Sequence, residues 1–103
     1  MAQLEVGTAR DFVPAGKQEI AIVDVRGVPA WTLVTVKLTV TKEDVEAGAV
    51  DPPQKEIVAD STGFARANFR FSSAQTGTVV LTGEARDGEG KVLGRSAKGV
   101  TIQ

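Results

Sequence analysis

In residues Leu33–Thr41 (LVTVKLTVT), apolar and polar side chains alternate from Val34 onward, and this period of two constrains the fold more than any other feature. Successive side chains of a β-strand point to opposite faces, so four apolar residues share one face: Val34, Val36, Leu38 and Val40. The other face carries Lys37 and three threonines. The pattern predicts a strand with one face in a core and the other in water.

The same period recurs along the chain, and no stretch has a convincing helical period. We predict further strands over residues 3–8, 19–25, 55–59, 64–71, 78–86 and 91–103, with the 55–59 strand at a sheet edge. In the 19–25 strand the alternation leaves two phases open. Either Ile20 and Ile22 face the core, or Ala21, Val23 and Val25 do.

Turn signals separate these strands. Pro14-Ala15-Gly16 and Arg26–Ala30 contain both glycine and proline, and Asp87-Gly88-Glu89-Gly90 predicts a hairpin turn. Gly94 and Gly99 predict a bulge or bend in the last strand. Residues 42–54 predict a long irregular loop, because their acids and Pro52-Pro53 disfavour a central strand.

About seven short strands with regular turn signals predict an all-β fold, an immunoglobulin-like β-sandwich of antiparallel strands with Greek-key connections. A chain of 103 residues suits one such domain over residues 1–103. Its hydrophobic content of 42% is ordinary for a globular domain, and no apolar run approaches the ~20 residues that span a bilayer. We therefore expect no membrane insertion.

Three segments carry a resemblance to a known family: IVDVRGVPAWTLVTVKL, VADSTGFARANFRF and TGTVVLTGEARDGEGK. In order, they place a strand ending in Asp before Gly-x-Pro, a turn of the Ala-Asp-x-x-Gly-x-Ala kind, and a Gly-Thr-x-x-Val strand. Over roughly residues 17–90 the chain resembles bacterial immunoglobulin-like modules of the invasin and intimin stalk type. The resemblance implies a sandwich with a structural or adhesive role and brings no catalytic residues.

The composition argues against catalysis. Histidine and cysteine are absent, so neither a Ser-His-Asp nor a Cys-His constellation can form. The spacing of the glycines follows the predicted turns and breaks of the strands, and none belongs to a phosphate-binding loop. We expect no enzyme activity, no cofactor and no small-molecule substrate. A carbohydrate-binding module is a remote alternative, because five aromatic residues hardly supply a planar platform.

Metal binding has a weak signal in residues 42–54. Glu43, Asp44, Glu46 and Asp51 could supply oxygen ligands to Ca²⁺, but their spacing matches no calcium-loop signature. A solvated acidic loop is the simpler interpretation, so we predict no metal site, and ion binding by this loop stays open. The pair Asp87 and Glu89 is explained by the hairpin turn alone.

The segment Asp60-Ser61-Thr62-Gly63 predicts a corner in which Asp60 or Ser61 bonds the amides of the turn. In the strand that follows, Ala65, Ala67, Phe69 and Phe71 take the core phase. The opposite phase holds Phe64, Arg66, Asn68 and Arg70, a candidate contact surface because aromatic residues and arginine favour interfaces. A local contact of Phe64 with a neighbouring loop is the alternative.

Trp31 is the single tryptophan and completes the set of candidate interface residues. We expect its ring to cap one end of the core. The alternative is an exposed anchor for a partner, since Trp is enriched at binding hot spots.

Charge is unevenly distributed behind a net charge of −1. Residues 1–60 sum to −4 and residues 61–103 to +3. Scattered surface charge is the simpler interpretation, while opposite poles would favour ordered contacts between copies. No basic tract is dense enough to predict nucleic-acid binding.

These observations predict a non-enzymatic structural or interaction module. Phage virions carry immunoglobulin-like domains of this size, so we expect a capsid decoration or tail accessory protein, with copies of itself or a shell protein as partners. The alternative is one repeat of a bacterial surface adhesin stalk. Met1–Glu5 does not resemble a signal peptide, so the chain is either made without export or belongs to a larger exported protein. The expected location is a virion or a bacterial cell surface.

Overall fold

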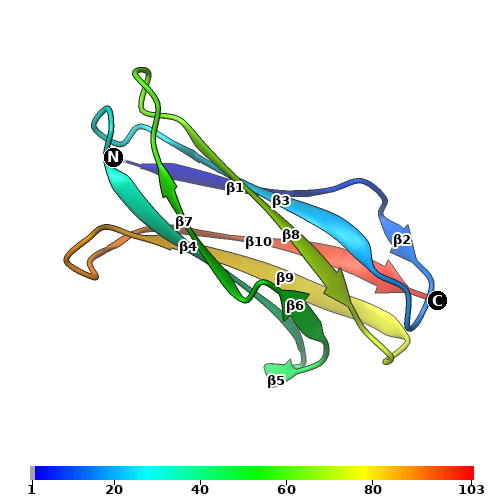
Figure 1. The fold of residues 1–103 in the computed structure, drawn as a ribbon. Coiled ribbons are helices and arrows are strands. Elements are labelled where there is room, and N and C mark those ends of the chain that lie inside the picture. Colours follow the sequence, from blue (N-terminus) through cyan, green and yellow to red (C-terminus); the bar gives the residue numbers. More distant parts are fainter. Residues whose placement is uncertain (1) are drawn as a thin grey trace.

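Two β-sheets face each other in the computed structural model, which describes residues 2–103. Sheet A has the strand order β1 (Gln3–Thr8), β3 (Glu19–Arg26), β8 (Ala65–Ser72) and β6 (Ala49–Asp51). Sheet B has the order β2 (Phe12–Val13), β10 (Val92–Ile102), β9 (Gly77–Arg86), β4 (Leu33–Lys42) and β5 (Val45–Glu46). The strand β7 (Gln54–Val58) also pairs with β4. Figure 1 shows the two layers, with connections that pass repeatedly from one to the other.

The all-β sandwich predicted from the alternation is confirmed, and each predicted strand is present within one or two residues of its expected bounds. The loop prediction for residues 42–54 is wrong, because β5 and β6 lie inside it. The strand β2 was not predicted either, and its pairing with β10 is parallel. These strands have two or three residues, too few for an alternating pattern. Residues 2–103 therefore contain ten strands where about seven were expected.

The long strands follow the predicted alternation. In β4 the apolar residues from Val34 to Val40 are buried, and in β8 every second residue from Ala65 to Phe71 is buried. The open question in β3 is settled by burial of Ala21, Val23 and Val25, which turns Ile20 and Ile22 outward. Both isoleucines thus lie on the outer face of sheet A.

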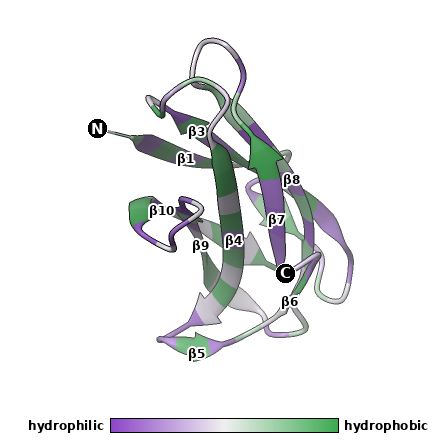
Figure 2. Cartoon of the chain, turned by 60° about the vertical axis from the view of Figure 1, so that its left-hand side comes forward, coloured by the Kyte–Doolittle hydropathy of each residue, from purple (hydrophilic) through white to green (hydrophobic). Residues whose placement is uncertain are grey.

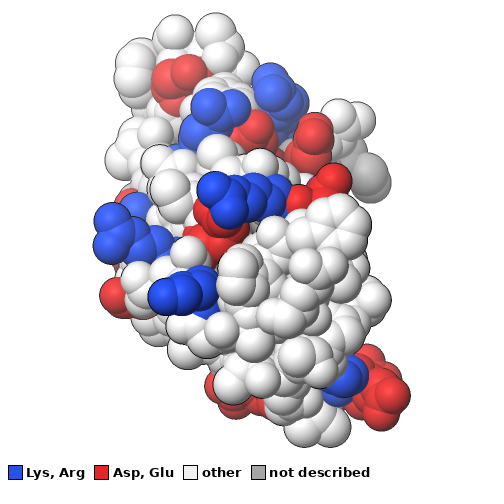
Figure 3. Space-filling view, turned by 90° about the vertical axis from the view of Figure 1, so that its right-hand side faces the viewer, with Lys and Arg blue, Asp and Glu red and all other residues white. Residues whose placement is uncertain are grey.

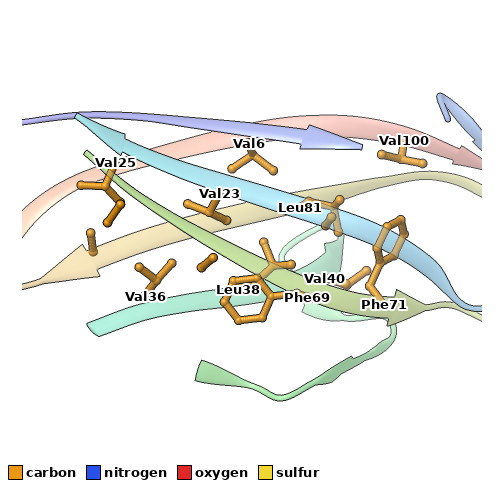
Figure 4. Packing of buried hydrophobic residues seen from close by; sticks show 14 of the residues in the cluster. Val6, Val23, Val25, Val36, Leu38, Val40, Phe69, Phe71, Leu81 and Val100 are labelled. Atoms are coloured by element: carbon orange, nitrogen blue, oxygen red, sulfur yellow. The ribbon is translucent and has the colours of Figure 1, made fainter. Parts of the chain in front are cut away.

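The core lies between the sheets and contains mainly valine, alanine and leucine, with Phe69 and Phe71 as its largest side chains. Figure 4 shows Phe69 beside Leu38 of the opposite sheet, and Val6 and Val23 near the β1 edge. Each large side chain buried in this way contributes about 1.5–3 kcal/mol to folding.

Two glycine predictions have different outcomes. The pairing of β10 with β9 shifts register between Val92 and Gly94, as the predicted bulge requires. At Gly99 the pairing with Val80 is regular, so no bulge occurs there. In the Asp87–Gly90 turn, the positive φ falls on Gly90, while the carboxylate of Asp87 accepts bonds from the amides of Glu89 and Lys91.

Within residues 2–103 no helix long and apolar enough to cross a membrane is present.

Candidate functional site

The outer face of β8 places the predicted contact residues in one row. Arg66, Asn68 and Arg70 are exposed, and Phe64 lies half-buried just before the strand. Their neighbours on β3 are fixed by the register, which sets Arg66 opposite Asp24, Asn68 opposite Ile22 and Arg70 opposite Ile20. These neighbours divide the row into two unlike halves.

In the first half, Phe64 and Arg66 are engaged within the molecule. Arg66 donates two hydrogen bonds to Asp24, from Nε to Oδ1 at 2.7 Å and from Nη2 to Oδ2 at 3.1 Å. The guanidinium carbon of Arg26 lies 4.7 Å from the centre of the Phe64 ring, and that of Arg66 lies 5.6 Å away. Both guanidinium groups thus lie within cation–π distance of the Phe64 ring, whose π-electrons attract positive charge.

The electrostatics of this cluster are close to balanced. Hydrogen bonding to the carboxylate of Asp24, and then its charge, raise the pKa of Arg66 above its ordinary value. Arg26 also approaches Asp24, at 4.0 Å. In Figure 3, acidic and basic groups adjoin in a band over one part of the surface, beside a broad area without charge. The observed contacts of the Phe64 ring are thus with the guanidinium groups of Arg26 on β3 and Arg66 on β8.

The second half of the row is different, because Asn68 and Arg70 border an open hollow on the outer side of sheet A. The hollow has a volume of about 580 Å³. It is lined by Ile20, Ile22, Asp51, Pro52, Lys55, Asn68 and Arg70. We call it the Arg70 hollow. The sequence pointed to Asn68 and Arg70, but Lys55 and Asp51 reach the hollow only because β6 and β7 lie beside β8.

Trp31 does not cap the core, so that prediction is wrong. The residue is 68% exposed, and its backbone has a positive φ of 65°. The amide of Trp31 donates to the carbonyl of Ala59 at 3.1 Å, which fixes the loop between β3 and β4 against the loop between β7 and β8. Buried Val28 and Ala59 already close the core at this end, so the ring turns outward.

Two exposed apolar residues lie near Trp31 along the backbone. Leu33 follows it by two residues, and Val58 directly precedes Ala59, which accepts the hydrogen bond from the amide of Trp31. Leu33 and Val58 pair across β4 and β7, and they are 43% and 57% exposed. Figure 2 shows the hydrophobic end of β7 beside the hydrophobic start of β4. We call Trp31, Leu33 and Val58 the Trp31 patch. The sequence carried a signal for it, because Leu33 shares its phase with the solvent-facing Thr35 and Lys37.

The corner at Asp60–Gly63 is structural. One carboxylate oxygen of Asp60 accepts bonds from the amide of Thr62 at 2.8 Å, the hydroxyl of Thr62 at 2.6 Å and the amide of Phe64 at 3.1 Å. These bonds, the hydroxyl first, lower the pKa of Asp60. The prediction that Asp60 bonds the amides of its own turn is confirmed.

The acids of residues 42–54 do not converge. In the described part of the chain, no three carboxylate residues lie close enough together to hold a metal ion. Glu43 and Asp44 form the turn between β4 and β5, and both have positive φ angles, of 52° and 66°. Asp51 lies elsewhere, beside Arg70 in the pairing of β6 with β8.

No protein-family model matches the chain, and no curated protein matches it in sequence. Solved structures do match in fold. The CARDB domain of a Pyrococcus furiosus protein, solved with di-metal ions, has a TM-score of 0.73 at 13% identity, covering 100% of this chain and 88% of that one. The Salmonella enterica SafA pilin in complex with the SafB chaperone gives 0.71 at 14% identity, covering 98% and 54%.

The periplasmic chaperone SfaE is also similar, with a TM-score of 0.50 at 9% identity, covering 97% of this chain and 55% of that chain. The present chain thus spans about half the length of the pilin–chaperone and SfaE chains that it matches. At these identities the likeness concerns the fold, which is the immunoglobulin-like β-sandwich. A sequence match to the invasin and intimin stalk family is not among these findings.

Proposed function

We propose that this chain is a non-enzymatic protein-binding module that docks through the Trp31 patch onto a larger assembly at a virion or bacterial surface. The observation that carries the proposal is the exposed Trp31, fixed by a backbone bond beside the exposed pair Leu33 and Val58. Binding hot spots are enriched in tryptophan, and Trp31 is a large, exposed aromatic residue with apolar residues beside it.

Two further observations support a protein partner. The fold neighbours include a pilin solved together with a chaperone, which is a protein-binding use of the same architecture. A sugar platform needs several aromatic rings in one plane. Exposed Phe12 belongs to β2 and exposed Trp31 to the loop between β3 and β4, and these two segments lie toward opposite ends of the sandwich (Figure 1). The chemistry of the surface therefore favours a protein over a carbohydrate.

Size-exclusion chromatography coupled to light scattering tests the proposal, with the chain alone and mixed with purified virus particles or bacterial surface protein. We expect co-migration with one of these, lost in Trp31→Ala and kept in Phe12→Ala, a matched exposed aromatic residue far from the patch. Binding to particles supports the decoration role, and binding to surface protein supports the stalk-repeat alternative. A chain that binds neither, or a Trp31→Ala variant that binds as well as wild type, overturns the proposal.

A further inference from the structure

The Arg70 hollow contains cations that the protein itself does not neutralise. Every other arginine lies within 4.0 Å of a carboxylate oxygen, namely Arg10, Arg26, Arg66, Arg86 and Arg95. Among the described residues Arg70 has no such partner, even though the register sets it opposite Asp51. Lys55 of the same hollow is also without a carboxylate at this distance. With Asp51 included, the lining carries a net charge of +1.

The floor of the hollow is apolar. Ile20 is 47% exposed and Ile22 is half-buried, both on the outer face of β3. Together with the ring of Pro52, they supply the apolar part of a lining that also contains the two cations and the amide of Asn68. A ligand for this site would combine negative charge with an apolar group of modest size.

The hairpin between β4 and β5 has these two properties. Its tip consists of Glu43, Asp44, Val45 and Glu46, which we call the acidic tip. In the described residues none of its three carboxylates has an ion pair, and Val45 is 66% exposed. The neighbouring Lys42 does not neutralise them, because its ammonium group donates to the carbonyl of Thr76 at 2.7 Å. Figures 1 and 2 show β5 protruding at the bottom of the sandwich.

We propose that the acidic tip of one copy of this chain binds in the Arg70 hollow of a second copy. Val45 would cover Ile20 and Ile22, while the tip carboxylates pair with Lys55 and Arg70. The tip belongs to the edge of sheet B and the hollow to the outer face of sheet A, so the contact joins two different surfaces. Such a head-to-tail contact leaves one tip and one hollow free, and it extends into a ring or an open chain of copies.

The inference deepens the proposed function by naming a second copy as a partner, but it uses none of the Trp31 patch. Trp31→Ala should therefore leave self-association unchanged, and the two proposals fail separately. Exposed ion pairs are individually weak, so the association should be weak and should decrease as salt is added.

Charge exchange tests the contact by sedimentation of the full chain over a range of concentrations. We expect Lys55→Glu/Arg70→Glu, and separately Glu43→Lys/Asp44→Lys, to weaken self-association by about tenfold or more. In a mixture of the two double variants, the native tip of one meets the native hollow of the other, and the exchanged tip meets the exchanged hollow. Both contacts again join opposite charges, so the mixture should recover the association that each double variant has lost. The chain with all four changes should again associate with itself, because its charges are exchanged and still opposite.

Asp51→Asn gives a change in the opposite direction. It removes the one carboxylate of the hollow and should strengthen self-association, while Lys91→Glu, on the distant β9–β10 hairpin, serves as a charge-change control without effect. Circular dichroism confirms that each variant is folded. A wild-type chain that stays monomeric at every concentration overturns the proposal. The proposal is also overturned if both double variants lose self-association and neither their mixture nor the fourfold variant recovers it.

Discussion

Asp24 on β3 binds Arg66 on β8 through two parallel hydrogen bonds, of 2.7 and 3.1 Å, whereas Arg70, four residues later, binds no carboxylate within residues 2–103. The two arginines share a strand, a face and an exposed position, but on β3 the register sets Asp24 opposite Arg66 and Ile20 opposite Arg70. Arg66 is therefore engaged by a carboxylate within the fold, whereas Arg70 is not engaged in this way in the part of the chain that the structure describes.

This difference predicts unequal effects on stability. Arg66→Ala should lower the urea midpoint of unfolding. The change removes the bidentate hydrogen bonding to Asp24 and one of the two cation–π contacts of Phe64. Arg66→Lys should lower the midpoint too, since an ammonium group cannot form the two parallel hydrogen bonds of the guanidinium group. The decrease should be smaller than for truncation of a core residue such as Phe69, for which about 3–5 kcal/mol is typical. Arg70→Ala is the matched control and should leave the midpoint unchanged; an equal decrease would contradict the distinction.

Two glycines with the same φ allow the cost of backbone strain to be measured separately from the cost of steric crowding. Gly16 and Gly63 both have φ of 78°, but a Cβ at Gly16 meets nothing within 4 Å, whereas at Gly63 it would collide with the carbonyl oxygen of Val28. Gly16→Ala should cost only the strain of a left-handed residue, about 1–2 kcal/mol. Gly63→Ala adds displacement of the Val28 loop, so we expect about 2–4 kcal/mol in total. Denaturant titration measures both, and equal costs would show that the corner tolerates the side chain.

Trp31 should be almost neutral for stability despite its size. Its ring is exposed, so Trp31→Ala should change the free energy of unfolding by less than about 0.5 kcal/mol. Trp31→Gly should be no less stable than Trp31→Ala, because the positive φ of this position offsets the usual cost of glycine, about 0.5–1 kcal/mol. The wild-type tryptophan emission should shift little on unfolding, so circular dichroism should follow the transition. A large blue shift of the native emission would show a buried ring instead.

The sequence predicted the long strands because a sheet with one buried face leaves a period of two in every strand, as β4 and β8 show. It could not predict β5 and β6, which are too short to show a period. The prediction for Trp31 was wrong because the direction of a side chain in a turn depends on the sign of φ. A tryptophan in the sequence does not predict a positive φ. The Arg70 hollow was beyond prediction, since it requires Lys55 and Asp51 to lie beside β8 through long-range pairing.

Acid should destabilise the protein partly through two carboxylates. Hydrogen bonds from Thr62 and Phe64 lower the pKa of Asp60, and hydrogen bonds from Arg86 and then Arg95 lower the pKa of Glu84. A folded-state pKa below the unfolded value means that ionisation favours the folded state. This contribution is fully present above the ordinary values of about 4, and it is lost as the pH falls through the lower folded-state values.

Asp60→Asn should therefore flatten the decline of stability below about pH 4, because its amide does not titrate. The variant should already be less stable at neutral pH, where it lacks the charged acceptor of the corner. Ser61→Ala changes the same corner without removing a titrating group, and it should keep the wild-type slope. Urea unfolding at a series of pH values measures these profiles. If Asp60→Asn and wild type lose stability in parallel as the pH falls, Asp60 does not contribute to the acid sensitivity.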